Sequence, residues 1–401
     1  MCKKKKVLSL IMCVSMLACA CGGGQETEKE ESESKNTSEV TEEVDERQKC
    51  LDEIQPYAYG NVDGLHLEPG TYISIIGKSA SGEFWEAVEE GAKAAASDIN
   101  NNLGYKGEDK IKVVYSGPSE SENVDEQVNI LDEEMDRNPA AIGIAIIDAQ
   151  SCEVQFDIAT MNDIPIVAFD SASDYQGIMA KVGTDNKAVS RTAASRTAEA
   201  MKERGKVIVL AHDSVSETAM ERTEAFVEEM QENHPGIAVA NTYYLDKLDE
   251  KKKAMADEIN AGIYTLENGV EEEKVDVDDE ETIEAESITD EQVLDYILRK
   301  NPEVTAIYAT NEDAVIAALN TCDRLKNEDI MITGFDVSKE EVAALKDGRI
   351  VGLVKQNPYG IGYATVVAAA RSALEMGNEA EVNTGYTWVT SEMANKQEIQ
   401  Y

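Results

Sequence analysis

The chain has 401 residues and a formal net charge of -42, with 37 Lys and Arg against 79 Asp and Glu. So little basic surface cannot neutralise phosphates, which argues against nucleic acid as a partner. The cysteines beyond the N-terminal segment, Cys50, Cys152 and Cys322, are dispersed, so they predict neither a disulfide framework nor a zinc site.

The N-terminus has the organisation of an export signal. Four lysines at positions 3–6 precede a short apolar run at 7–17, which is too short to span a bilayer. The small residues and cysteine that follow resemble a bacterial lipobox, with Cys21 as the lipidated residue and Cys19 as the alternative. We therefore expect a signal peptide at 1–20 and a lipid anchor on the extracytoplasmic face of the cell membrane.

Two segments are dominated by acidic residues. Residues 21–68 are interpreted as a disordered tether, because a stretch poor in large apolar residues cannot offset its ordering entropy. Residues 267–291 are interpreted as a solvated insertion. The run at 276–280 resembles the start of a calcium loop, but Glu281 and Ser287 stand where such a loop needs Gly and Glu, so no metal site is predicted.

From Tyr72 onward, β-rich runs alternate with helical patterns. A first series of strands is followed, from about Asp185, by a second, which predicts two doubly wound α/β lobes with parallel sheets. The expected strands are 72–76, 111–115, 141–147, 164–169, 206–211, 237–243, 304–309, 330–333 and 350–355. Helices are expected between them, beginning with 84–99 and including 186–203.

Polar and aromatic residues recur just after these strands. In open α/β sheets, ligands bind beyond the carboxyl ends of the strands. Carboxylates and amides there suit the hydroxyls of a polyol, and aromatic rings suit its C–H face. The residues concerned are Phe84, Trp85, Asp170, Asn311, Asp336 and Gln356.

Competing interpretations are weaker. Gly77-Lys78-Ser79 imitates the end of a phosphate loop, but Tyr72 stands where its first Gly belongs, and 360–362 lacks the third Gly of a dinucleotide loop. His66, His212 and His234 are far apart and are interpreted as exposed or loop residues. Because neither HExxH nor Gly-x-Ser-x-Gly occurs, no enzymatic activity and no cofactor are predicted.

From Tyr72 to Trp388 the chain resembles the type 1 periplasmic binding proteins of the ribose/galactose-binding class. Short motifs in the order of that family carry the resemblance, namely Phe84-Trp85 with Glu90-Gly91-Ala92, the segment from Ile164 to Asp170, Val182 to Asn186, Glu221 to Phe226, Ala309 to Glu312, Gly334 to Asp336, and Gln356 to Pro358.

The resemblance implies roles for the site residues. Phe84 and Trp85 would stack on a sugar ring, Asp170 would accept hydrogen bonds from its hydroxyls, and Arg222 would donate from the second lobe. Asn311, Asp336 and Gln356 would complete the shell. Ser171 stands where ribose binders usually have Arg, and 82–83 are Gly-Glu where they have Asn-Pro, so the identity of the sugar stays open.

It also implies lobes joined by a three-crossing hinge, with 69–184 and 358–383 in the N-terminal lobe and 185–357 and 384–401 in the C-terminal lobe. The expected function is that of a monomeric substrate-binding lipoprotein that delivers a monosaccharide to an ABC transporter permease. The alternative is a lipoprotein that presents a sugar or other small metabolite to a sensor kinase or chemoreceptor.

Overall fold

The computed structural model describes residues 46–266, 269–270 and 282–396, and its main folded unit begins at Arg47. Cys19, Cys21, the export signal and the acidic run 276–280 lie outside the described residues. Within the described ranges, no helix is both long and apolar enough to cross a membrane.

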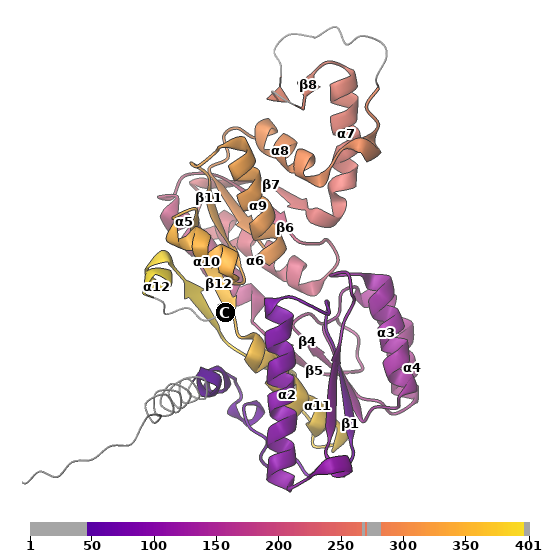
Figure 1. Ribbon diagram of the computed structural model, residues 1–401. Coiled ribbons are helices and arrows are strands. Elements are labelled where there is room, and N and C mark those ends of the chain that lie inside the picture. The colour runs from indigo at the N-terminus through magenta and orange to yellow at the C-terminus, as the bar shows by residue number, and fades with distance from the viewer. Residues whose placement is uncertain (1–45, 267–268, 271–281, 397–401) are drawn as a thin grey trace, which may run out of the picture. The chain divides into compact units, whose positions relative to one another are not determined.

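Six parallel strands form the first sheet, in the spatial order β13-β5-β4-β3-β1-β2. They are β1 (Tyr72–Ile76), β2 (Lys112–Ser116), β3 (Ala141–Ile144), β4 (Ile166–Phe169), β5 (Ile178–Gly183) and β13 (Glu381–Asn383). One face is covered by α2 (Glu83–Leu103) and α11 (Pro358–Ala373), the other by α3 (Val124–Asp136) and α4 (Ala149–Met161) (Figure 1). We call these elements the first lobe.

The second sheet has the order β14-β12-β11-β10-β6-β7 and forms the second lobe. Its strands are β6 (Gly205–Ala211), β7 (Ile237–Tyr244), β10 (Ala306–Ala309), β11 (Met331–Phe335), β12 (Ile350–Gln356) and β14 (Tyr386–Val389). One face packs on α5 (Asn186–Ala200) and α6 (Glu217–Asn233). The other packs on α7 (Leu248–Asn260), α8 (Asp290–Lys300), α9 (Glu312–Leu325), α10 (Lys339–Lys346) and α12 (Ser391–Asn395).

The chain passes between the two sheets after β5, after β12 and after β13. Hydrogen bonds tie these crossings together: Thr184 Oγ1 donates to Gln356 Oε1 at 3.0 Å, and Asn357 Nδ2 donates to the Thr384 carbonyl at 2.8 Å. Side chains from both lobes therefore meet beside the crossings.

The predicted fold class, two doubly wound lobes, is confirmed. The structure adds two strands of the first sheet that the sequence pattern did not reveal, β5 and β13, and β14 pairs antiparallel with β12. The predicted strand at 141–147 ends at Ile144, because the chain beyond it leaves the ladder and leads to α4, whose N-cap is Asp148.

The described part of the predicted tether is not a tether. Residues 47–52 are helical, and the segment to Leu67 packs on the first lobe as a collar. Ile54 is fully buried and Tyr59 nearly so, while the backbone of Gln55 exchanges hydrogen bonds with Asn383. Tyr57 is exposed, but the other large apolar residues of this collar, Leu51, Ile54, Tyr59, Val62, Leu65 and Leu67, are at most 8% exposed. Their burial offsets the entropy lost when the segment becomes ordered.

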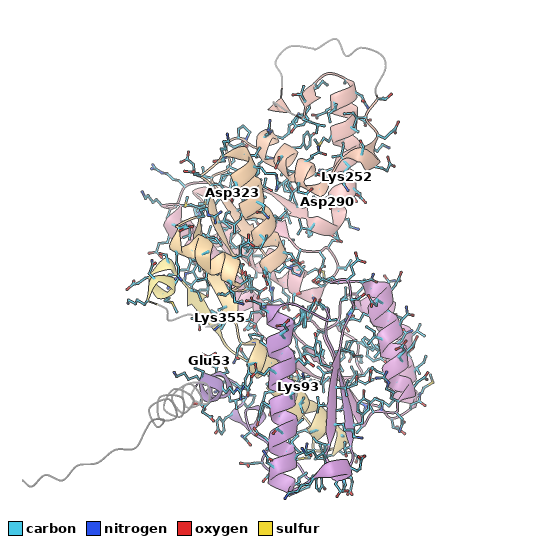
Figure 2. All side chains as sticks on the ribbon, viewed as in Figure 1. Glu53, Lys93, Lys252, Asp290, Asp323 and Lys355 are labelled. Carbon is cyan, nitrogen blue, oxygen red and sulfur yellow. The ribbon has the colours of Figure 1, made fainter. Side chains whose placement is uncertain are left out.

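The collar also lies against the crossings. Asn357 Nδ2 donates to the Cys50 carbonyl, and Glu53 lies beside Lys355 (Figure 2). Burial raises the pKa of Glu53, and the Lys355 ammonium acts against that rise.

The predicted insertion is shorter than expected at its C-terminal end. Ile288 is buried against the second lobe, Thr289 forms a capping box with Gln292, and α8 begins at Asp290. An ion pair of 2.8 Å between Lys252 and Asp290 links the capped start of α8 to α7 (Figure 2). On the N-terminal side, β8 (Tyr264–Thr265) pairs antiparallel with β9 (Gly269–Val270).

Candidate ligand-binding site

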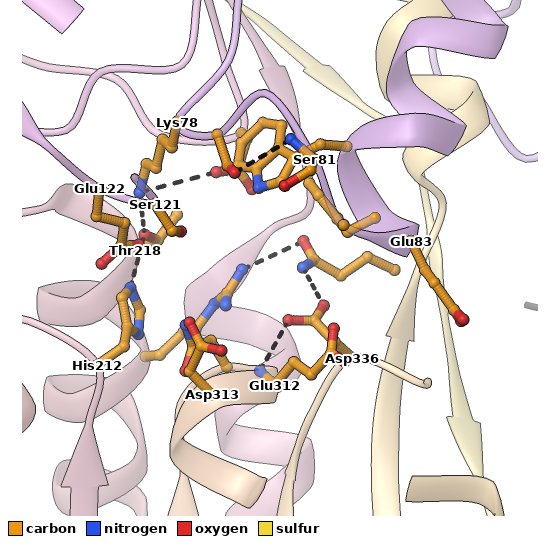
Figure 3. A pocket seen from close by; sticks show the side chains of 18 of the residues that line it. Lys78, Ser81, Glu83, Ser121, Glu122, His212, Thr218, Glu312, Asp313 and Asp336 are labelled. Carbon is orange, nitrogen blue, oxygen red and sulfur yellow. Dashed lines mark hydrogen bonds and ion pairs between the residues drawn. The ribbon is translucent and has the colours of Figure 1, made fainter. Parts of the chain in front are cut away.

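A cavity of about 400 Å³ lies between the lobes, at the carboxyl ends of strands from both sheets (Figure 3). All seven residues predicted to bind a ligand line it: Phe84, Trp85, Asp170, Arg222, Asn311, Asp336 and Gln356. The parallel strands bring together residues that are up to 272 positions apart because every strand of a parallel sheet ends at the same edge.

The first lobe contributes an aromatic pair at the start of α2. Gly82, with φ of 113°, lets the chain turn into the helix, and Phe84 and Trp85 follow at once. Their rings meet edge to face, with centroids 5.0 Å apart, and Trp85 also contacts Phe169 of β4. This packing fixes the rings and leaves them half-buried at the cavity wall.

Asp170 follows β4 and adopts a left-handed backbone conformation, with φ of 56°. Its amide donates to the Val182 carbonyl of β5 at 2.8 Å, which holds the turn. The cation beside its carboxylate is Lys78, 3.9 Å away, which comes from the loop after β1. Asp336, directly after β11, also has a left-handed backbone conformation, with φ of 72°.

The second lobe contributes a network centred on Arg222 of α6, which is almost fully buried. Its guanidinium donates to Asn186 Oδ1 at 2.8 Å, to the Thr310 carbonyl at 2.7 Å and to Gln356 Oε1 at 3.2 Å, and it lies 4.0 Å from the centre of the Phe335 ring. The protein therefore already engages Nε and both Nη atoms of this side chain.

The same network continues to Asp336. Gln356 Nε2 donates to Asp336 Oδ1 at 2.7 Å, and the Glu312 amide donates to Oδ2 at 3.3 Å. Burial raises the pKa of Asp336, while Arg222 and the Gln356 hydrogen bond oppose that rise.

Asn311 is the N-cap of α9, where its Oδ1 accepts the Ala314 amide at 2.9 Å. The cap engages the amide oxygen and leaves Nδ2 as the group able to donate to a ligand.

Sequence reasoning missed several wall residues. Lys78, set aside with the phosphate-loop interpretation, is 2% exposed and donates to Thr218 Oγ1 of the second lobe at 3.2 Å. Glu122, after β2, also lines the cavity. Burial raises the pKa of Glu122 to about 7; Lys78 opposes this rise, and the carboxylates of Asp213, Asp313 and Asp170 add to it.

His212 is a loop residue, one of the two alternatives predicted for it, but it is not exposed. It follows β6, is buried in the cavity wall, and its Nδ1 lies 2.6 Å from Thr310 Oγ1. Burial lowers the pKa of its ring, and the Asp213 carboxylate, 3.4 Å from Nε2, opposes this effect. The strand-end rule that identified Asp170 did reach Lys78 after the first strand, but Lys78 was considered only as part of a phosphate-loop motif. The same rule would have found His212 had it been applied after β6.

The periplasmic binding protein domain family matches residues 73–267 and 250–378. The ribose import binding protein of Escherichia coli K12 is 20% identical over 297 residues, which cover 74% of this chain and 83% of that protein. The ribose import binding protein of Bacillus subtilis is 26% identical over 144 residues, covering 34% and 47%.

Solved structures share the fold at low identity. A carbohydrate transporter solute-binding protein of Agrobacterium radiobacter, in complex with D-arabinose, has a TM-score of 0.62 at 23% identity, covering 82% of this chain and 97% of that one. A solute-binding protein of Agrobacterium vitis, bound to α-D-tagatopyranose, has a TM-score of 0.64 at 21% identity, covering 82% and 97%. The family model matches most of this chain, and a cavity lies between its two lobes; the chain therefore belongs to the periplasmic binding proteins and has their type 1 fold.

Proposed function

We propose that the protein is an extracytoplasmic substrate-binding lipoprotein of an ABC importer and binds a monosaccharide in the interlobe cavity. The observation that carries this proposal is the composition of the cavity. Aromatic rings from the first lobe face a fixed set of hydrogen-bonding groups from the second, which suits a ring with one apolar face and several hydroxyls.

The site residues take the roles that this arrangement allows. Trp85 and Phe84 stack on the ring, Asp170 and Asp336 accept hydroxyl hydrogen bonds, and Asn311 donates through Nδ2. Arg222 and Gln356 act mainly by keeping Asp336 in position, because Arg222 donates to Gln356 and Gln356 donates to Asp336. The other polar atoms of Arg222 already bond to Asn186 and Thr310.

Contacts between the lobes support closure around a ligand. Besides the Lys78–Thr218 hydrogen bond, Lys181 of β5 forms an ion pair with Glu217 of α6 at 2.8 Å, and Glu217 also accepts the Ala172 amide at 2.9 Å. A ligand that contacts both walls favours the closed form because only that form supplies both sets of contacts.

The proposal is tested by measuring the melting temperature of the mature protein with a panel of pentoses and hexoses. Binding to the folded state raises the melting temperature with ligand concentration. We expect at least one monosaccharide to do so. If no sugar shifts the transition while another class of metabolite does, the sugar assignment is wrong.

Anchoring is tested separately. Substitution of Cys21 by Ala, alone and together with Cys19→Ala, should leave the protein unprocessed or release it from the membrane. A double variant that is still processed and still partitions into detergent would contradict the lipoprotein assignment.

A further inference from the structure

The charges around the cavity are unbalanced. Six carboxylate side chains line it, namely Glu83, Glu122, Asp170, Glu312, Asp313 and Asp336, against the two cationic side chains Lys78 and Arg222. His212 also lines the cavity, and burial lowers its pKa, which disfavours a positive charge on its ring. Hydroxyl groups need acceptors, but a neutral polyol does not need this excess of negative charge.

Neither cation balances the excess. Arg222 is engaged by Asn186, Thr310 and Gln356. Lys78 faces Thr218 and Asp170, and its charge also acts on the Glu122 carboxylate. On the acidic side, Glu83 pairs with Lys339 at 2.9 Å, and Asp336 accepts two hydrogen bonds.

The carboxylates of Glu122 and Asp313 differ from those of Glu83 and Asp336. Among the described residues, neither carboxylate accepts a hydrogen bond or forms an ion pair, yet both line the cavity. Glu122 comes from the loop after β2 in the first lobe, and Asp313 from the first turn of α9 in the second (Figure 3). Asp313 raises the pKa of Glu122 and Lys78 lowers it, so the two carboxylates lie near one another across the cavity, and a cationic group between them would stabilise the ionised form of both.

We propose that the ligand carries a positive charge: a hydroxylated ring bearing an ammonium group, such as an amino sugar, whose ammonium is held between Glu122 and Asp313. This inference rests on the proposed function and narrows its ligand class. The hydroxyls donate hydrogen bonds to Asp170 and Asp336, and the ring stacks on the aromatic pair. The ammonium donates to the carboxylates of Glu122 and Asp313. The same charge excess repels a sugar acid.

Calorimetric titration of the mature protein with matched triplets tests the proposal: D-glucose, D-glucosamine and D-glucuronate, and the corresponding galactose series. A charge-assisted hydrogen bond contributes about 1.5–3 kcal/mol, so the amine should bind about tenfold or more tighter than its neutral parent, and the acid should not bind. Glu122→Gln and Asp313→Asn should each bring the ratio of amine to neutral affinity toward one.

Asp125→Asn is the matched control, because it removes the same charge from an exposed position at the start of α3, outside the cavity, and should leave the ratio unchanged. Neutral sugars that bind as well as their amines would overturn this inference and leave the proposed function standing. If no member of either triplet or of the wider sugar panel binds, the proposed function itself fails.

A metal ion is the competing source of positive charge, since Glu122, His212 and Asp213 have potential ligand atoms within 4.8 Å of one another. Titration with Ca²⁺, Mg²⁺ and Zn²⁺ in the absence of sugar decides this point. Saturable metal binding that Glu122→Gln abolishes, together with equal affinities for amine and neutral sugar, would overturn the inference. Absence of such binding supports it.

Discussion

The two walls of the cavity are built differently. In the second lobe, Arg222, Gln356 and Asp336 form one hydrogen-bonded chain, and Thr310 joins it to His212. In the first lobe, the wall is an aromatic pair held by ring contacts, and the buried Lys78 reaches across to the other lobe. The wall of the second lobe therefore holds polar groups in fixed positions, which reduces the entropy lost when a ligand binds. The wall of the first lobe offers mainly the faces of aromatic rings.

The largest expected effect comes from breaking the fixed wall. Arg222→Met leaves Asn186 Oδ1 and the Thr310 carbonyl without their buried donor, at a cost of about 1–3 kcal/mol each. We expect the melting temperature to fall and the affinity for the bound sugar to drop by roughly a hundredfold. Arg191→Met, which removes an exposed ion pair with Glu228, is the control and should change neither.

A variant Arg222→Met protein that binds sugar as tightly as the wild type would show that this wall is not organised for the ligand. Calorimetry together with a thermal melt separates lost affinity from lost stability.

Altering the aromatic wall should affect binding more than folding. Trp85→Ala removes a half-buried ring that is expected to stack on the sugar, so affinity should fall by about tenfold with a small change in melting temperature. The chain has two tryptophans, and Trp388 packs beneath β12, away from the cavity.

Fluorescence makes the same comparison directly. A sugar-dependent change in emission should disappear in Trp85→Phe and persist in Trp388→Phe. The opposite pattern would place the ligand elsewhere.

A smaller effect, on pH dependence, concerns His212. Burial lowers its pKa in the folded protein, whereas an unfolded histidine takes up a proton near pH 6.5. The unfolded state therefore binds more protons below that pH, and the folded state loses stability as the pH falls from 7 to 5. His212→Asn should reduce this loss, as measured by denaturant unfolding at both pH values. The control, His66→Asn, changes an exposed histidine; if both variants behave like the wild type, His212 is not held neutral by burial.

Much of the fold was predictable because parallel strands covered on both faces are apolar runs separated by helical patterns. β5 and β13 do not form such apolar runs in the sequence. β5 contains Lys181, which reaches α6, and β13 has only Val382 buried between two exposed residues. An edge strand of three residues is too short to show an alternation of apolar and polar residues, so it cannot be predicted without the strand it pairs with.

The ordered collar was not predicted from the sequence, for a related reason. Ile54, Tyr59 and Leu65 follow the acidic run that ends at Glu53, in a stretch without helical or strand periodicity whose one acidic residue is Asp63. The prediction extended the composition of the acidic run over this stretch and so missed the residues that pack. Their burial depends on a surface formed by α2 and α11, which local sequence does not reveal.

The site was more predictable than the collar, because strand order alone brings strand ends together. Asp170, Asn311, Asp336 and Gln356 were found by that rule. Glu122 was not, because it stands six residues beyond the end of β2, in a loop whose path depends on tertiary contacts.

The central claim is that one ligand is held by both walls, and a pair of isosteric variants tests it most directly. Asp170→Asn alters the first lobe and Asp336→Asn the second, and each exchanges a carboxylate acceptor for an amide of the same shape. Calorimetric titration with the tightest-binding sugar of the panel should show each variant weakened by roughly tenfold or more, up to about a hundredfold, with the fold intact by thermal melt. A ligand whose affinity is indifferent to both changes would contradict the account and place its binding site outside this cavity.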